Sequence, residues 1–277
     1  MSQKTILITG CSSGIGYTCA VGMRARGWRV FAACRTADDC ARLMAEGFES
    51  PQLDYTDATS IDAAVREVLA ATGGTLDVLF NNGAHGTPGA VEDLPTDALR
   101  AIFEANFFGW HHLTRALIPT MRQQGGGRII QCSSILGFIV MPWRGAYNAT
   151  KYALEGLTDT LRIEMRGTGI DVVLIEPGPV TSKIRANSIP HFERWIDWRG
   201  SARRAQYESG LKKRLYEPGA PDRFELPPTA VLEKLIHATE AQRPQPRYYV
   251  TTPTHVMGAL RRMLPTRALD WVLSRGS

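Results

Sequence analysis

The sequence lacks paired cysteines, metal-binding clusters and long apolar runs. Its five cysteines are scattered and include no Cys-x-x-Cys pair, a pattern that predicts reduced thiols rather than a disulfide framework. No group of Cys and His at ligand spacing predicts a metal site. No apolar run reaches the roughly 18 residues that a membrane-spanning helix needs, and the N-terminal residues lack the apolar region of a signal peptide. These absences favour a cytoplasmic protein.

The chain also lacks a strong excess of charge of either sign. It contains 32 Lys and Arg against 27 Asp and Glu, a net charge of +5. The basic residues are concentrated after Lys183, without the interleaved aromatic residues of a nucleic-acid groove, so nucleic-acid binding is not expected. With 277 residues, and an apolar fraction of 44%, the chain fits a single α/β domain over residues 1–277.

Seven short apolar runs are expected to form parallel strands, because buried parallel strands are rich in apolar and β-branched residues. Amphipathic helical patterns lie between most of these runs, which predicts an α/β fold with helices on both faces of one sheet. The expected strands cover residues 5–9, 28–34, 51–54, 76–80, 128–132, 170–175 and 248–251.

A glycine-rich turn follows the first of these strands and precedes a helix that is expected to end near Arg26. Strand, glycine turn and helix form the arrangement that binds the diphosphate of a dinucleotide. Gly10 permits the tight turn, Gly14 lets the backbone approach the diphosphate, and Gly16 lets the helix pack on the sheet. The helix N-terminus supplies free N–H groups and a positive dipole. The predicted diphosphate site comprises Gly10, Ser12, Ser13, Gly14, Ile15 and Gly16.

Tyr147 and Lys151 lie four residues apart in a segment with a helical pattern, so both side chains project from one helix face. A tyrosine with an ordinary pKa of about 10 is a poor acid–base catalyst near neutrality. The fixed positive charge of the lysine is expected to lower that pKa. The spacing alone is more often that of a solvated helix face, so the interpretation depends on the rest of the chain.

The glycine turn has the spacing Gly-x-x-x-Gly-x-Gly, and together with Tyr-x-x-x-Lys it resembles the short-chain dehydrogenase/reductase family. The resemblance extends to about residue 182, and the basic C-terminal region is similar to the retinol and 17-beta-hydroxysteroid dehydrogenase-like branch. It implies a Rossmann-like, doubly wound parallel sheet of about seven strands. It also implies that Asn106 holds a water against the catalytic lysine. The implied catalytic residues are Ser134, Tyr147, Lys151 and Asn106, with Ser134 preferred to its neighbour Ser133.

The same resemblance implies a preference between cofactors. An acidic residue at the end of the second strand binds the ribose hydroxyls of NAD, but Cys34 occupies that position. Arg35 and the Ser13 hydroxyl can instead bind a 2′-phosphate, so NADP(H) is expected in preference to NAD(H). The other implied contacts are Asp54 with the adenine amino group, Tyr55 along the adenine ring, Asn82, Gly83 and Ala84 beside the adenosine, and Pro177, Gly178, Val180 and Ser182 over the nicotinamide.

Beyond residue 182 the composition changes. Residues 183–226 are rich in Arg, Lys and aromatic side chains and are expected to form a substrate lid. The aromatic rings predict either a lipophilic pocket or packing of the lid onto the core. The C-terminal tail, residues 254–277, is amphipathic and basic. Packing of the tail against its own domain or a second subunit is favoured over weak contact with a membrane surface.

The predicted reaction is NADP(H)-dependent interconversion of a carbonyl and an alcohol on a lipophilic substrate, such as a retinoid, a hydroxysteroid or a long-chain aldehyde. By resemblance, the protein is expected to be a homodimer or homotetramer. Two alternatives are an NAD-dependent alcohol dehydrogenase of the same family and a non-catalytic NADP(H)-sensing protein. Sugar-nucleotide epimerases share the Tyr-x-x-x-Lys pair but need a larger C-terminal domain than 277 residues provide.

Overall fold

The fold is built on one parallel sheet, seen in a computed structural model that describes residues 3–217 and 222–275. Within these residues the strand order is β2-β1-β3-β4-β5-β6, and every neighbouring pair is parallel. The order reverses direction between β1 and β3, which makes the sheet doubly wound, as expected. The strands are β1 (Thr5–Ile8), β2 (Arg29–Ala32), β3 (Val78–Asn81), β4 (Gly127–Cys132), β5 (Ile170–Glu176) and β6 (Arg247–Tyr249).

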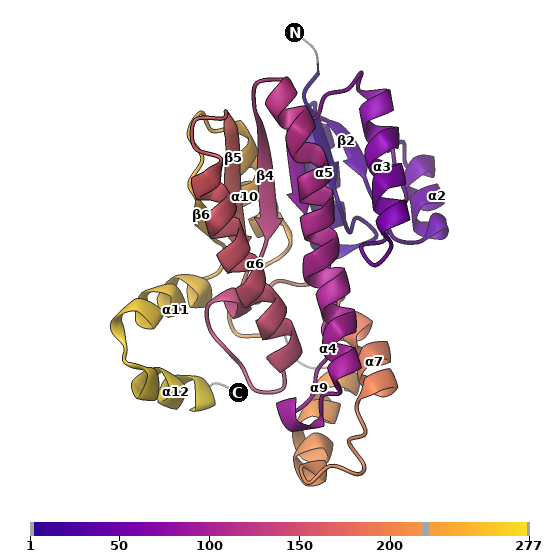
Figure 1. The fold of residues 1–277 in the computed structure, drawn as a ribbon. Helices are drawn as coiled ribbons and strands as arrows, with labels where there is room; N and C mark the ends of the chain where they lie inside the picture. The colour runs from indigo at the N-terminus through magenta and orange to yellow at the C-terminus, as the bar shows by residue number, and fades with distance from the viewer. Residues whose placement is uncertain (1–2, 218–221, 276–277) are drawn as a thin grey trace.

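Helices cover both faces of the sheet (Figure 1). Strand residues alternate between the two faces, so Ile6 and Ile8 pack towards α1 and α10 while Leu7 packs towards α3 and α5. Each strand is therefore apolar on both sides, as a covered parallel sheet requires. The helices of these layers are α1 (Gly14–Ala25), α2 (Ala37–Ala45), α3 (Ala58–Ala71), α5 (Gly109–Gln123), α6 (Gly145–Glu164) and α10 (Thr229–Glu240).

The expected strand over residues 51–54 does not form, and the described sheet has six strands rather than about seven. This segment runs beside β2 but makes only isolated bridges, Phe31 with Glu49 and Cys34 with Gln52. Pro51 has no N–H to donate to a ladder. The backbone N–H of Asp54 donates to the Ser60 hydroxyl at 3.0 Å instead of to a strand. The ladder therefore stops after two bridges.

The long helix expected over residues 97–123 is interrupted. It consists of α4 (Thr96–Phe103), a π-helical turn over Glu104–Phe108, and α5. The interruption places Asn106, which is fully buried, within the π turn. Single π turns of this kind are frequent at functional sites.

The segment predicted to be a lid folds into short helices at the carboxyl end of the sheet (Figure 1). They are α7 (Ile184–Trp195), α8 (Arg204–Gln206), a π turn over Tyr207–Leu211, and α9 (Lys212–Tyr216). Phe192 and Tyr207 are buried in a small apolar core that includes Ala90 of the main body. Of the two uses expected for the lid aromatics, these two rings serve packing. Residues 218–221 of this segment lie outside the described residues.

The tail forms α11 (Thr252–Met263) and α12 (Thr266–Arg275). Gly258 of α11 lies against Tyr249 of β6 so closely that a Cβ there would be 2.6 Å from the tyrosine ring. The start of the tail thus packs on its own domain, as favoured above. Met263 is 76% exposed, so the far side of α11 remains uncovered. Residues 276–277 lie outside the described part of the chain, in which no helix is long and apolar enough to cross a bilayer.

A buried ionic network joins α6 to the carboxyl end of the sheet. Arg247 of β6 pairs with Glu155 and, at 2.5 Å, with Asp159, both on α6. The same guanidinium pairs at 2.5 Å with Glu176, the fully buried last residue of β5. Burial and the neighbouring Glu155 carboxylate raise the pKa of Glu176 to about 8. One arginine therefore holds together the helix that carries Tyr147 and the strand that leads into Pro177.

Replacing the shared arginine is expected to be strongly destabilising. Arg247→Met leaves buried carboxylates without their cation, which costs about 3–5 kcal/mol and lowers the melting temperature by about 10 °C. Arg100→Met is the matched control, because Arg100 pairs with Asp97 where the two side chains are 71% and 73% exposed and such pairs contribute about 1 kcal/mol or less. Equal losses of melting temperature in the two variants would contradict the structural role of Arg247.

Candidate active site

The glycine turn after β1 is packed directly against the turn after β3. A Cβ on Gly10 would lie 2.3 Å from the Asn82 carbonyl oxygen, and one on Gly16 would lie 2.3 Å from the Gly10 carbonyl oxygen. Gly10 and Gly14 also have φ values of +67° and +58°, which side chains with a Cβ rarely adopt. Ser13 occupies the N-cap position of α1 without a side-chain cap. The closely packed start of α1, whose N–H groups are not capped by the Ser13 side chain, fits the diphosphate of a dinucleotide.

The residues predicted to bind the adenosine end lie at the carboxyl ends of β2 and the neighbouring segment. Cys34 is a buried thiol, whereas Arg35 is exposed and makes no ion pair within residues 3–217 and 222–275. The Ser13 hydroxyl likewise makes no hydrogen bond to a described residue. Asp54 accepts hydrogen bonds from the backbone N–H and the hydroxyl of Thr56 at 2.9 and 2.8 Å. Arg35 and Ser13, the two residues predicted to bind a 2′-phosphate, thus have no side-chain hydrogen-bond or ion-pair partner among the described residues.

Tyr55 differs from its expected place along an adenine ring, because its side chain points inward. Its hydroxyl donates to Asn81 Oδ1 at 2.7 Å and lies 2.7 Å from the Thr9 hydroxyl. The ring packs against Trp110, with centroids 5.7 Å apart. From inside the protein, Tyr55 therefore stabilises the end of β3, where the following turn begins. In that turn Asn82 is fixed by a hydrogen bond to the Thr9 carbonyl at 3.1 Å, and Gly83 and Ala84 follow it.

The side chains predicted to be catalytic come together at the carboxyl end of β4. Ser134 follows β4 and lies close enough to Tyr147 to act on the pKa of its phenol, while the Ser134 hydroxyl accepts from the Leu136 N–H at 3.1 Å. Lys151, only 1% exposed, donates from Nζ to the Cys132 carbonyl at 2.8 Å. The neighbouring Ser133 hydroxyl points into the protein and is buried without a partner. This arrangement favours Ser134 over Ser133 as the reacting hydroxyl.

The electrostatics of Tyr147 differ from the expectation that Lys151 lowers its pKa. Burial raises the pKa of Tyr147, and the hydrogen bond from Ser134 and the charge of Arg144 oppose that shift. The Lys151 ammonium lies 5.7 Å from the Tyr147 ring centroid and is directed at the Cys132 carbonyl. Burial lowers the pKa of Lys151 itself to about 8. A lysine that loses its charge this readily polarises the phenol less than a permanently charged one.

Asn106 does not present its side chain to Lys151. Its amide donates to the His85 carbonyl at 2.9 Å and to the Thr150 hydroxyl at 3.5 Å. Its Oδ1 accepts from the His85 N–H at 3.2 Å. Both donors are thus used, and these bonds link the π turn, α6 and the turn after β3. Asn106 is a positioning residue in this structure.

The turn after β5 faces the glycine turn. The Ile135 N–H donates to the Pro177 carbonyl at 2.7 Å, so this turn is tied to the Ser134 segment. A Cβ on Gly14 would lie 3.6 Å from the Ser182 Cβ. The Thr181 hydroxyl donates a hydrogen bond to the Glu225 carboxylate at 2.6 Å. These contacts hold two of the predicted nicotinamide residues, Pro177 and Ser182, beside the Ser134 segment and the glycine turn respectively.

Sequence reasoning missed a contact that closes the predicted lid onto this crevice. The rings of His85 and His191 are stacked, with centroids 3.6 Å apart and an interplanar angle of 5°. Beside them the Gly86 N–H donates to the Ser188 hydroxyl at 3.2 Å. Burial and the partner imidazole lower the pKa of His85 to about 4. Isolated histidines 106 positions apart in the chain carry no local signal of such pairing.

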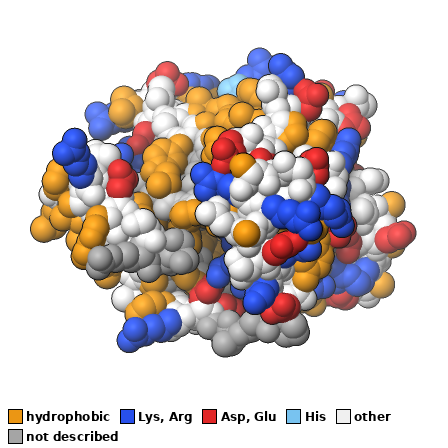
Figure 2. Space-filling view, turned by 90° about the horizontal axis from the view of Figure 1, so that it is seen from below, with side chains coloured by type: hydrophobic (Ala, Val, Ile, Leu, Met, Phe, Trp, Pro, Cys, Tyr) orange, Lys and Arg blue, Asp and Glu red, His pale blue; other side chains and the backbone are white. Residues whose placement is uncertain are grey.

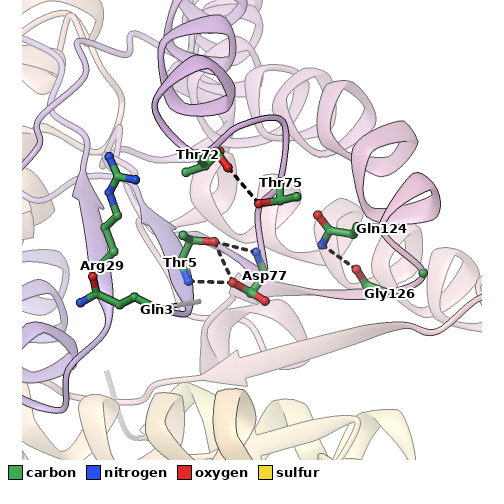
Figure 3. A pocket seen from close by; sticks show the side chains of 9 residues that line it. Gln3, Thr5, Arg29, Thr72, Thr75, Asp77, Gln124 and Gly126 are labelled. Atoms are coloured by element: carbon green, nitrogen blue, oxygen red, sulfur yellow. Dashed lines mark hydrogen bonds between the residues drawn. The ribbon is translucent and has the colours of Figure 1, made fainter. Parts of the chain in front are cut away.

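A hollow of about 480 Å³ lies at the amino ends of the strands, at the end of the sheet opposite to Ser134 and Tyr147 (Figure 3). It is lined by Thr5 and Asp77 at the amino ends of β1 and β3, and Asp77 accepts from the Thr5 N–H at 2.7 Å and from its hydroxyl at 2.8 Å. Ligands of doubly wound sheets bind at the carboxyl ends of the strands. This hollow therefore lies apart from the candidate active site.

The fold and the crevice define a dinucleotide-binding protein of the doubly wound α/β class. Comparison with known proteins agrees: residues 4–191 match the short chain dehydrogenase family. YbbO, named as an uncharacterized oxidoreductase of Escherichia coli K12, is 40% identical over 98% of this chain and 94% of its own length. Human 17-beta-hydroxysteroid dehydrogenase type 1 is 31% identical over 91% of this chain and 78% of its own length.

The structural comparison leads to the same family. The crystal structure of a short-chain dehydrogenase from Streptomyces avermitilis superposes with a TM-score of 0.76 and 29% identity, covering 100% of this chain and 99% of that one. The chain belongs to the short-chain dehydrogenase family and is an oxidoreductase of that family.

The stacked histidines predict a loss of stability in acid. Because the fold lowers the pKa of His85 to about 4, the unfolded chain takes up the proton first as the pH falls. The free energy of unfolding that the uncharged His85 contributes is therefore fully present above about pH 6.5. This contribution is lost as the pH falls from about 6.5 to about 4. His85→Phe keeps a flat ring without the titration. We expect its melting temperature to fall less than that of the wild type between about pH 7 and pH 5.

His111→Phe is the control for this measurement, since His111 is exposed on α5. Its melting temperature is expected to follow that of the wild type across the same range of pH. A variant at His85 that loses as much stability in acid as the wild type would contradict the role given to the histidine stack.

Proposed function

We propose that this protein is an NADP(H)-dependent oxidoreductase that interconverts a carbonyl group and an alcohol on a lipophilic substrate. Long-chain aldehydes, retinoids and hydroxysteroids are the substrate classes we favour. The observation that carries the proposal is the convergence of Ser134, Tyr147 and Lys151 at the carboxyl end of β4, beside a glycine turn with the geometry of a diphosphate site. We further propose that residues 1–277 form one functional unit, with residues 183–226 as substrate lid.

Each residue of the site has a distinct task in the proposed reduction. The bound nicotinamide cofactor supplies the hydride. The Ser134 hydroxyl donates a hydrogen bond to the carbonyl oxygen and orients it towards the neighbouring Tyr147. The Tyr147 phenol delivers the proton to that oxygen, as general acids do when the transferred proton lies within hydrogen-bonding reach. Lys151 holds the ribose hydroxyls of the cofactor and stabilises the phenolate that remains.

Asn106 acts on the reaction only through the backbone. By bonding both the N–H and the carbonyl of His85, it fixes the turn that borders the crevice. In the proposed mechanism its bond to the Thr150 hydroxyl keeps the π turn beside α6, the helix that carries Tyr147 and Lys151.

The preference for NADP(H) rests on Arg35 and Ser13. Neither side chain is committed to a described partner, and the adjacent Cys34 cannot accept hydrogen bonds from ribose as a carboxylate does. The alternative is an NAD-dependent alcohol dehydrogenase with the same catalytic residues. Proteins of the same fold with 24% and 20% identity have been solved with NAD and with NADP respectively, so the fold permits both cofactors.

Two further properties are proposed on the same basis. All five cysteines are buried free thiols, which suits the reducing cytoplasm. Membership of the family favours a homodimer or homotetramer. The exposed side of the tail, including Met263, is proposed to meet a second subunit rather than a membrane surface.

Removing the phenol hydroxyl tests the proposed acid directly. Tyr147→Phe is expected to lower kcat for aldehyde reduction by at least about a hundredfold, the contribution typical of a general acid. The dissociation constant for NADPH should stay nearly unchanged. Tyr152→Phe, on the exposed side of the same helix, is the matched control and should retain kcat. Unchanged kcat in the Tyr147 variant would remove the proposed mechanism and favour a non-catalytic NADP(H)-binding protein.

Reversing the charge at Arg35 tests the choice of cofactor. Arg35→Asp is expected to weaken NADPH binding by about tenfold to a hundredfold, because a charge-assisted contact becomes a repulsion. NADH binding should tighten, since a carboxylate can accept from the ribose hydroxyls. Fluorescence titration with both nucleotides measures the change, with Arg66→Asp on the exposed face of α3 as control. An unaltered NADPH to NADH ratio would show that Arg35 does not select the cofactor.

A further inference from the structure

Arg144 lies near Tyr147, two further arginines lie near Arg144, and none of the three has a task in the proposed reaction. Arg144 immediately precedes α6 and lies one turn before the tyrosine; Arg185 is in the first turn of α7; Arg214 is in α9. The charges of Arg185 and Arg214 act on Arg144, as does the Tyr147 phenol. Figure 2, which views the carboxyl-end face from below, shows Lys and Arg side chains interspersed with hydrophobic ones there.

Arg144 is the centre of this cluster and has no acceptor among residues 3–217 and 222–275. It is half-buried, and within the described residues its guanidinium makes neither an ion pair nor a hydrogen bond. Burial and the two neighbouring arginines lower its pKa to about 10. Desolvating a guanidinium without an acceptor is costly, and its five donors match an oxyanion. The cost is understandable if an anion binds here during function.

Acidic side chains nearby do not neutralise the cluster. Asp222 is the carboxylate that acts on Arg144, and it pairs with Arg214 at 3.4 Å. Glu225 feels the charge of Arg185, but its carboxylate accepts hydrogen bonds from the Thr181 hydroxyl and the Asp222 backbone N–H. Within the described residues Arg144 therefore has no carboxylate paired with it, and the charge of Asp222 acts against those of the two neighbouring arginines.

The backbone that holds Arg144 is strained, which is an independent sign of a constrained site. Trp143, the preceding residue, has a φ of +65°, the only positive value among the described residues that are not glycine. For a bulky residue this conformation is strained and is retained mainly where function requires it. The strain is held by the Trp143 ring, which packs edge-on against Tyr207 at 4.8 Å, and by the Gly89 N–H, which donates to the Trp143 carbonyl at 3.0 Å.

We propose that Arg144, assisted by Arg185 and Arg214, binds an oxyanion group of the substrate next to the reacting carbonyl. The substrate is then a carbonyl compound with a lipophilic chain and an acidic head group, a carboxylate, sulfonate or phosphate, rather than a wholly neutral lipid. This narrows the substrate class of the proposed function and rests on that function. Arg144 and Tyr147 are three residues apart across the start of α6, where Cβ atoms lie about 5–6 Å from one another. The acidic group is therefore only a few bonds from the carbonyl carbon.

The test compares two ligands that differ in one charge, 4-oxodecanoate and its methyl ester. Both are titrated calorimetrically into protein saturated with NADP+, which cannot reduce them, so binding is measured without turnover. The keto acid is expected to bind at least about tenfold more tightly than the ester, as a charge-assisted contact implies. In Arg144→Gln this ratio should fall close to one, and Arg144→Lys should restore part of it.

Two variants keep the test decisive if Arg144→Gln folds poorly. Arg185→Gln, on a half-exposed position of α7, should lower the same ratio, while Arg194→Gln, exposed on the same helix and stacked over Trp195, should leave it unchanged. A keto acid that binds no better than its ester, or a preference that survives both cluster variants, would overturn the proposal.

Two separate readouts distinguish other failures. If Arg144→Gln weakens NADP+ binding while the preference for the keto acid persists, Arg144 serves the cofactor phosphates and the proposal is overturned. Reduction of the neutral methyl ester by NADPH reports on the proposed function alone. An ester that is reduced without any preference for the acid would leave that function standing and refute the anion site.

Discussion

The active site depends on one buried ammonium. Lys151 is almost completely removed from water, and its Nζ donates to the main-chain carbonyl of Cys132 at the end of β4. The Trp110 ring, 4.2 Å away, and the charge of the Glu155 carboxylate also stabilise the ammonium. This bond fixes α6 against the carboxyl end of the sheet and thereby sets Tyr147 beside Ser134. A lysine that ended in solvent would leave the phenol free to rotate away from the serine.

The surrounding structure maintains that bond from several sides. One turn further along α6, Glu155 joins the Arg247 network, which anchors the helix to β5 and β6. Asn106 ties the π turn to Thr150, the residue before the lysine, and to the turn after β3. The glycines of the first turn allow that turn to pack closely enough to complete the crevice. Packing, ionic pairing and backbone geometry thus together determine where the side chains of Lys151 and Tyr147 lie.

The parts of the fold and the site that adjacent residues encode could be predicted from the sequence. The strand, glycine turn and helix around Gly10 follow from periodicity and from the space that only glycine leaves, and the sheet is doubly wound as expected. The strand expected at 51–54 was wrong. The apolar pattern does not reveal that the Asp54 N–H donates to the Ser60 hydroxyl, which, together with the missing N–H of Pro51, prevents a continuous strand ladder. The direction of Tyr55 was equally hidden, since its partners Thr9 and Asn81 lie in segments distant in sequence, after β1 and at the end of β3. The histidine stack and the arginine cluster join segments distant in sequence, so no local pattern identifies them.

The central claim is that hydride passes from a nicotinamide cofactor to a substrate carbonyl held at Ser134 and Tyr147. Incubation with NADPH carrying deuterium at the transferable position of C4, and with a lipophilic aldehyde such as decanal, tests it by mass spectrometry of the product. Deuterium on the alcohol carbon with wild-type protein, and none with Tyr147→Phe, is the predicted result. Oxidation of the cofactor without label in the alcohol, or equal labelling by the variant, would contradict the claim.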